Sequence, residues 1–191
     1  MSMHATKTQS QCPTKSEQHP APDLLSLLNE WIGKNRSGPA ILLRALPSRE
    51  VLRALNQDVD LLVTPDQASE LLRLAYEDVL KGRCHVQIES RHRCKIQLIL
   101  WTTDTSEKLS VDLWLEWNQT LSRRVISTTA LHEIRTPATE IPDAVLPNVA
   151  KLPDDIELAL LILHIVTKKR KVVSAMNHRR LLQLIQSLEA G

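Results

Sequence analysis

The segment Asp58-Val59-Asp60-Leu61-Leu62-Val63 places two carboxylates at the start of an apolar run. A run of this length and composition is typical of a buried β-strand. Residues two apart on a strand point to the same side of a sheet, so the side chains of Asp58 and Asp60 project together. Like charges held this close repel one another, and either solvent or a divalent cation relieves the repulsion. The segment therefore predicts a strand that opens at a solvated edge or at a metal site.

A helix is predicted directly after this strand, because Thr64 can cap it, Pro65 suits its first position and Gly82 can end it. Further along, residues 109–117 alternate, with Leu109, Val111, Leu113, Leu115 and Trp117 on one face and Ser110, Asp112, Trp114 and Glu116 on the other. If this strand lies beside the first one, Asp112 would complete a site that can hold one or two metal ions for phosphoryl transfer.

The remaining segments predict an α+β fold (mixed α/β), in which a mixed sheet is flanked by helices and followed by a C-terminal helical pair. The expected elements are a helix from residue 24 to about 34, strands at 40–46, 84–89, 95–101 and 123–129, and helices at 154–171 and 175–190. The strands at 84–89 and 95–101 are separated by a polar turn, which favours antiparallel pairing. Residues 136–153 contain four prolines and are expected to form an irregular connection.

Length and composition indicate the organisation of the chain. Its 191 residues are 42% hydrophobic and 24% charged, which suits one globular domain. The segment 1–22 has almost no large apolar side chains and is expected to be a disordered tail. We therefore divide the chain into this tail, an α/β domain at 23–135, and the proline-rich connection with the helical pair at 136–191.

The same composition bears on cellular setting and partners. The longest apolar run, residues 156–166, is interrupted by Glu157 and His164, so no membrane span is expected. A net charge of +2 argues against bulk electrostatic capture of nucleic acid. Three cysteines and the absence of an apolar leader predict a reducing, cytoplasmic setting.

The order of these motifs resembles that of the nucleotidyltransferase superfamily with a DNA polymerase β-like palm, especially its small stand-alone members. The DVDLLV segment at 58–63 is similar to the DIDLLV motif of that family, and SVDLW at 110–114 resembles its third acidic motif. The resemblance covers roughly residues 40–116. One subgroup, encoded among polysaccharide-biosynthesis genes, has Leu-Arg-Gly where this chain has Leu43-Arg44-Ala45, and its members also end in helices.

The resemblance implies a metal-dependent nucleotidyltransferase that moves a nucleoside monophosphate from a nucleoside triphosphate to a hydroxyl acceptor. Asp58, Asp60 and Asp112 would be both its catalytic residues and its metal ligands, with Mg²⁺ (or Mn²⁺) as the cofactor. The acceptor could be a sugar, a small molecule or a protein. Ala45-Leu46 stands where the family has a Gly-Ser turn for the phosphates, so Arg44 or Arg49 is expected to contact them instead.

Two other classes of function remain open. The loss of the Gly-Ser turn suits a catalytically degenerate module of the same fold that binds a ligand or a partner. Basic clusters at 91–95, 168–171 and 178–180 are solvated ends or, alternatively, a phosphate-binding surface of a nucleic-acid-associated regulator.

Two smaller features also have alternative interpretations. Cys84, His85, His92 and Cys94 straddle one turn and could bind zinc, or the cysteines could simply be core residues. Trp114 shares the face of Asp112 and could stack on a base, although packing is the more usual role of such a side chain.

Overall fold

A computed structural model of the protein describes residues 23–44, 46, 58–92, 94–115, 117–118, 125–126, 145–168 and 174–190. Its helices are α1 (Leu24–Lys34), α3 (Pro65–Leu80), α5 (Asp154–Lys168) and α6 (Ala175–Ala190). The main sheet contains β1 (Ile41–Leu42), β2 (Asp58–Leu62), β3 (His85–His92), β4 (Lys95–Trp101), β5 (Lys108–Trp114) and β8 (Ala150–Lys151). A separate two-stranded sheet pairs β6 (Trp117–Asn118) with β7 (Val125–Ile126).

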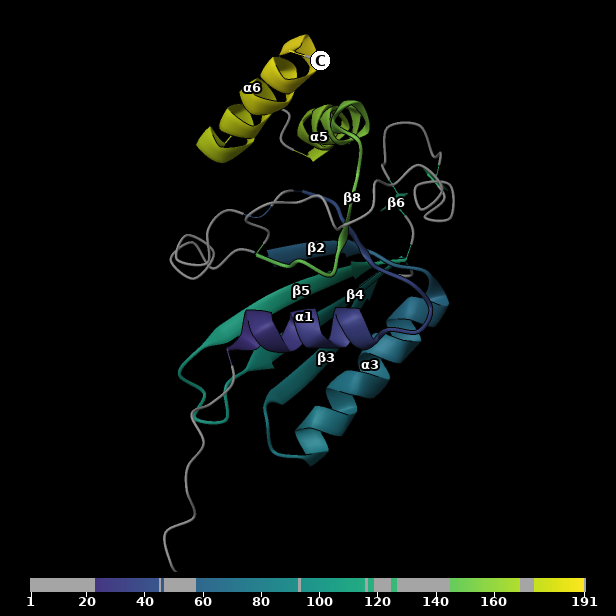
Figure 1. Ribbon diagram of the computed structural model, residues 1–191, viewed down its shortest axis with the longest axis vertical. Coiled ribbons are helices and arrows are strands. Elements are labelled where there is room, and N and C mark those ends of the chain that lie inside the picture. The colour runs from purple at the N-terminus through teal and green to yellow at the C-terminus, as the bar shows by residue number, and fades with distance from the viewer. Residues whose placement is uncertain are drawn as a thin grey trace, which may run out of the picture.

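The main sheet is mixed, with the strand order β3-β4-β5-β2-β1-β8. The pairs β2–β5 and β1–β8 are parallel, and the other neighbours are antiparallel. Figure 1 shows α1 and α3 lying against one face of this sheet, while α5 and α6 lie beyond its β8 end. The predicted α+β class, with a mixed sheet, flanking helices and a C-terminal helical pair, is confirmed.

Two apolar clusters hold these layers together, one on each side of the sheet. The larger cluster buries alternate residues of β2, β4 and β5, such as Val59, Leu98 and Val111, against α1 and α3. The smaller cluster joins β1, β2 and β8 to Leu160 of α5. Alternation along β2 therefore directs the aspartates away from the larger cluster, toward the side on which α5 packs.

The helix caps expected from the sequence are present at the starts of α1 and α3. The side chain of Asp23 accepts a hydrogen bond from the backbone N–H of Ser26 at 3.3 Å and caps α1. At α3, Thr64 accepts from the backbone N–H of Gln67 at 3.2 Å, and the Gln67 side chain accepts from the backbone N–H of Thr64 at 2.9 Å. This reciprocal capping box satisfies N–H groups that have no partner within a helix.

Several strand boundaries differ from the predicted ones. β1 covers two residues of the expected 40–46, β3 runs on to His92 through the expected turn, and β5 ends at Trp114. The segment 123–129 supplies β7, which pairs with β6 rather than with the main sheet. Residues 145–153, expected to be irregular, contain β8, and its backbone N–H at Ala150 donates to the carbonyl of Ala40 at 2.8 Å. The expected tail at 1–22 lies outside the described residues.

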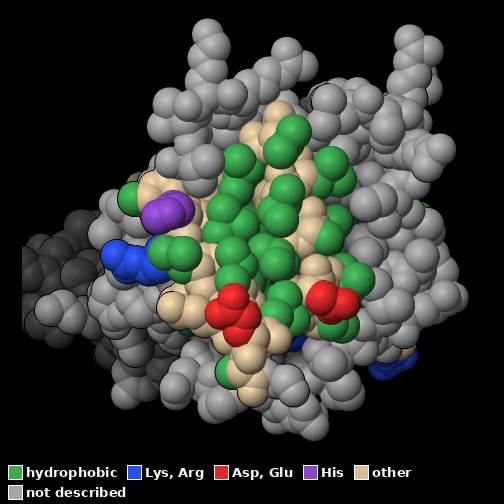
Figure 2. All heavy atoms as spheres, turned by 90° about the horizontal axis from the view of Figure 1, so that it is seen from above, with side chains coloured by type: hydrophobic (Ala, Val, Ile, Leu, Met, Phe, Trp, Pro, Cys, Tyr) green, Lys and Arg blue, Asp and Glu red, His purple; other side chains and the backbone are tan. Residues whose placement is uncertain are grey.

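The helical pair α5–α6 presents apolar side chains on its outer surface. Figure 2, which looks down on this end of the molecule, shows hydrophobic side chains gathered over the pair. The exposed ones on the two helices are Ile162, Val166, Leu182, Ile185 and Leu188. Within the described part of the chain, no helix has both the length and the apolar character needed to cross a membrane.

Candidate functional site

The pairing of β2 with β5 brings two of the predicted site residues together. In this parallel pair Asp60 lies directly opposite Asp112, and Asp58 lies opposite Ser110. Neighbouring strands are about 4.8 Å apart, and directly paired residues point to the same side of the sheet. Asp58, Asp60 and Asp112 therefore share one face, as the sequence predicts for adjacent strands.

The three carboxylates differ in their exposure to solvent. Asp58 is exposed at the start of β2, whereas Asp60 is 8% exposed and Asp112 is 3% exposed. Burying an ionised carboxylate is costly unless hydrogen bonds and opposite charges compensate for lost hydration. Asp60 and Asp112 therefore require partners, and both have them.

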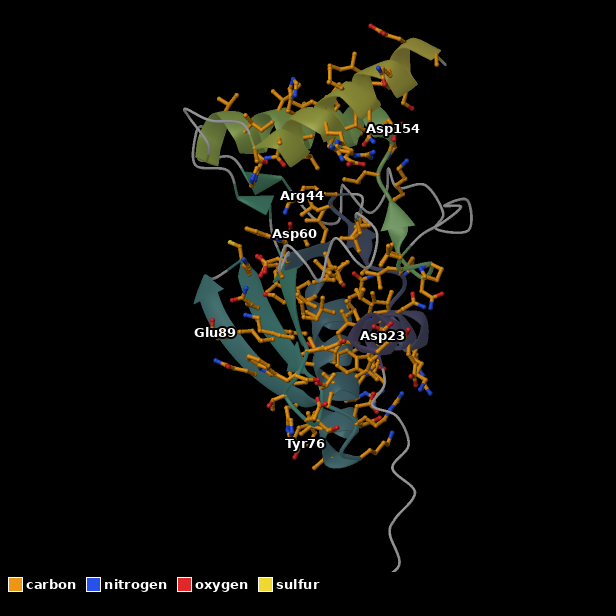
Figure 3. All side chains as sticks on the ribbon, turned by 90° about the vertical axis from the view of Figure 1, so that its left-hand side faces the viewer. Asp23, Arg44, Asp60, Tyr76, Glu89 and Asp154 are labelled. Atoms are coloured by element: carbon orange, nitrogen blue, oxygen red, sulfur yellow. The ribbon has the colours of Figure 1, made fainter. Side chains whose placement is uncertain are left out.

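Asp60 is held by one neutral donor and one cation. The indole N–H of Trp114 donates to Oδ1 of Asp60 at 2.9 Å, and the Arg44 guanidinium forms an ion pair with Oδ2. Figure 3 shows Arg44 and Asp60 at the end of the sheet that faces α5 and α6. Arg44, which is expected to contact phosphate, thus lies at the Asp60 carboxylate. Arg49 lies outside the described residues.

Asp112 has the same division of partners, both of them from β4. The Gln97 side-chain amide donates to Oδ1 of Asp112 at 3.0 Å, and the Lys95 ammonium forms an ion pair with Oδ2. The Lys95 ammonium also lies 4.9 Å from the ring centre of Trp114, which is within the range of a cation–π contact. The β4–β5 register explains these contacts, because Gln97 is paired with Asp112 and Lys95 with Trp114.

The environment of Asp112 raises the pKa of its carboxyl group above the ordinary value. Burial is the main cause, the ion pair and hydrogen bond with Lys95 oppose it, and the negative charges of Asp60 and Asp58 add to it. These charges act on Asp112 because the three acids lie close together. Mutual repulsion of this kind is what a divalent cation would relieve.

One buried atom at the site lacks a hydrogen bond. Gln97 is 5% exposed, and its amide also donates to the hydroxyl oxygen of Ser110 at 3.0 Å. Its carbonyl oxygen, Oε1, has no hydrogen-bond partner among the described residues. Leaving a buried acceptor unsatisfied costs about 1–3 kcal/mol. The site therefore contains an oxygen that can accept a hydrogen bond or bind a cation, next to the Asp112 carboxylate.

The residues suit Mg²⁺ or Mn²⁺ in chemical type, because these ions prefer carboxylate and carbonyl oxygens. In the structure, however, the buried carboxylates are already ion-paired with basic side chains of the same chain. Among the described residues, no three His, Cys, Asp or Glu side chains are arranged to hold a metal ion. Arg44 and Lys95 each contact one carboxylate oxygen, so a metal could bind both acids only after these cations move aside.

The four candidate zinc ligands lie at opposite ends of a hairpin and so cannot bind one ion together. In the β3–β4 hairpin His85 pairs with Trp101, whereas His92 pairs with Lys95. About 20 Å of extended strand separates these two ends. Cys84 is buried in the larger apolar cluster, where burial raises the pKa of its thiol to about 11. The core interpretation of Cys84 is therefore the right one, and the zinc interpretation is wrong.

The structure describes Trp114 and part of the basic clusters, which are the remaining candidate residues. Trp114 packs against the smaller apolar cluster and also orients Asp60, a role that the sequence did not indicate. Of the basic clusters, only 178–180 is described with its side chains throughout, and there Arg180 forms an ion pair with Glu157. The sequence places Lys95 in the basic cluster at 91–95 and gives no role to Gln97, whereas the register of β4 against β5 brings both beside Asp112.

Comparison of the chain with family models, with curated proteins and with solved structures found no match.

Proposed function

We propose that the protein is a metal-dependent nucleotidyltransferase, which transfers a nucleoside monophosphate from a nucleoside triphosphate to a hydroxyl acceptor and releases pyrophosphate. One observation carries this proposal: Asp60 and Asp112 are directly paired on adjacent parallel strands, with Asp58 on the same face. Carboxylates on neighbouring strands are a common way to hold the ions that neutralise a transferring phosphoryl group.

In this proposal each residue of the site has a defined role. Asp58, Asp60 and Asp112 would hold Mg²⁺ or Mn²⁺, and the bound ion would neutralise the triphosphate and align it for in-line attack. Trp114 and Gln97 fix the orientation of the two buried carboxylates by donating to them. The acceptor would be a sugar, a small molecule or a protein, and the resemblance to proteins encoded with polysaccharide-biosynthesis genes favours a sugar.

A thermal-shift panel tests this function without knowledge of the acceptor. The four common nucleoside triphosphates are added singly, with and without Mg²⁺ or Mn²⁺. A ligand at a hundred times its Kd stabilises the folded state by about 2.7 kcal/mol, which raises the Tm of a domain of this size by about 5–10 °C. We expect such a shift only when metal and nucleotide are both present.

Two variants make the panel specific to the site. Asp60→Asn should abolish the shift, because the amide replaces a carboxylate ligand. Asp104→Asn is the matched control and should leave it intact, since Asp104 lies in the β4–β5 turn and bonds only locally to Thr102 and Ser106 in the contacts described. If no nucleotide raises the Tm of the wild-type protein in the presence of metal, the proposed transferase is wrong.

A second function, a catalytically degenerate binding module of the same fold, is favoured by a different observation. Arg44 and Lys95 neutralise the buried acids without a metal ion. This function predicts no metal-dependent nucleotide shift even with millimolar Mn²⁺, while the protein remains folded. A nucleic-acid-associated regulator would instead show binding that weakens steeply with salt.

A further inference from the structure

The partners of the buried carboxylates are of two kinds, and the two kinds contact different oxygens. Oδ1 of Asp112 accepts from the neutral amide of Gln97, and Oδ2 contacts the Lys95 ammonium. The same division holds at Asp60, where a tryptophan indole N–H donates to Oδ1 and an arginine guanidinium contacts Oδ2. Each acid is thus oriented by a neutral group and neutralised by a cation.

The neutral groups and the cations differ in their freedom to move. Gln97 is 5% exposed and is also bonded to Ser110, so it cannot leave its position without disrupting the sheet surface. The Lys95 side chain is 16% exposed and that of Arg44 is 34% exposed, whereas Asp112 and Asp60 are more deeply buried. Both cations have long flexible stems and an outlet to solvent. They can therefore move away from the carboxylates.

The charge balance shows when they would move. Asp60 and Asp112 contribute two negative charges, and Arg44 and Lys95 contribute two positive ones. A divalent cation entering this pair would be repelled by both basic side chains unless they left. A triphosphate arriving with the metal supplies a new anionic partner for the ammonium and the guanidinium.

We propose that Lys95 and Arg44 are internal counterions, which exclude free divalent cations from Asp60 and Asp112 and transfer to the triphosphate when metal and nucleotide bind together. This inference rests on the proposed function and adds to it a dependence of metal binding on nucleotide. Lys95 and Arg44 would then bind phosphate in the loaded state and pair with Oδ2 of Asp112 and Asp60 in the free state. Trp114 and Gln97 keep the other two oxygens in both states.

The test measures the affinity of the protein for Mn²⁺ alone by electron paramagnetic resonance. Lys95→Met removes the counterion and should tighten Mn²⁺ binding about tenfold or more, because the metal no longer displaces an ion pair. Lys108→Met is the matched control: its ammonium lies 5.7 Å from the ring of Trp101, at the opposite end of the β4–β5 pair, and the affinity should not change. Adding Asp112→Asn to Lys95→Met should remove the gain.

A second measurement should change in the opposite direction to the Mn²⁺ affinity. Loss of structure would not produce both changes together. Binding of a nucleoside triphosphate together with Mn²⁺ should weaken about tenfold in Lys95→Met, because a cation that contacts phosphate is lost. If Lys95→Met does not fold, Lys95→Gln serves in its place, since it removes the charge and keeps a hydrogen-bond donor. Far-ultraviolet circular dichroism of each variant checks the fold.

The outcomes separate this inference from the function on which it rests. Tighter Mn²⁺ binding with weaker nucleotide binding supports the counterion role. Unchanged Mn²⁺ affinity in both Lys95 variants, in a protein whose wild type binds nucleotide with Mn²⁺, overturns that role and leaves the transferase standing. Failure of wild type and variants alike to bind Mn²⁺, with or without nucleotide, overturns both.

Discussion

The indole N–H of Trp114 donates to Oδ1 of Asp60 at 2.9 Å, from one strand of the β2–β5 pair to the other. Trp114 is paired with Leu62, two residues along from Asp60, so the contact is a diagonal one on the same face of the sheet. Its ring packs against the smaller apolar cluster and lies beside the Lys95 ammonium. One side chain thus links the packing of α5 to the position of a buried carboxylate.

This contact predicts a measurable loss in Trp114→Phe. The phenyl ring keeps most of the apolar contact but cannot donate to the carboxylate. Hydrogen bonds to charged groups contribute about 1.5–3 kcal/mol, so the free energy of unfolding should fall by about that amount. Urea denaturation measures it. Trp101→Phe, on β4 beside Lys108, is the control; an equal loss there would show that the hydrogen bond to Asp60 has no special weight.

Gln97→Glu should destabilise the protein at neutral pH. The change keeps the shape of the side chain but replaces an amide that donates to Asp112 and Ser110 with a further negative charge. We expect a loss of about 1–3 kcal/mol in the free energy of unfolding at pH 7, and a smaller loss at pH 4, where the new carboxyl gains protons. Gln87→Glu is the control, because Gln87 also donates to a carboxylate, that of Glu89, but is exposed.

The pH dependence of stability should include a contribution from Glu30 on α1. Its pKa is lowered from 4.5 to about 2, chiefly by the hydrogen bond from Arg83 and then by that from Lys34. A lowered folded-state pKa means that the stabilisation is present above the ordinary value and is lost as the pH falls from about 4.5 to 2. Wild type should therefore exceed Glu30→Gln in unfolding free energy at pH 7, and the difference should shrink toward pH 2.

Glu70 supplies the control for that measurement. It pairs with Arg73 on the exposed side of α3, and this hydrogen bond lowers its pKa as well. Solvent screens exposed pairs, so Glu70→Gln should change the pH profile much less. A profile for Glu30→Gln that runs parallel to that of wild type would contradict the assignment.

The helical pair depends on an ion pair between its two helices. Arg180 of α6 donates through Nε and Nη2 to the two carboxylate oxygens of Glu157 on α5, at 2.7 Å each. Glu157 is 2% exposed, and Arg180→Met removes the guanidinium that balances this buried charge. We expect a loss of about 3 kcal/mol in urea denaturation. Arg179→Met alters the exposed neighbour and should cost little; adding Glu157→Met to Arg180→Met should restore part of the stability.

Local patterns in the sequence predict the fold well where one segment contains all the information. The cap at Thr64 and the alternation of residues 109–114 are examples, since both depend on neighbours in the chain. β8 could not be found in this way, because two residues paired with a distant strand have no periodicity of their own.

In the candidate site, too, some features follow from residues near each other in the chain and others depend on strand pairing. The shared face of Asp58 and Asp60 follows from their spacing, whereas the direct pairing of Asp60 with Asp112 depends on which strands become neighbours. The contact of Lys95 with Asp112 depends on the register of β4 against β5, and that of Arg44 with Asp60 depends on the pairing of β1 with β2. The sequence pattern identifies the acidic residues of the site. It does not show which basic side chains will form ion pairs with them.

The pairing of β8 with β1 also constrains the order in which a newly made chain can finish folding. Until Ala150 and Lys151 have left the ribosome, one side of β1 has no neighbouring strand, although β2 to β5 are already available. An open strand edge invites pairing with other chains. Polypeptides released before that point should accumulate in inclusion bodies, so a reporter fused after residue 144 should be far less soluble than one fused after residue 190.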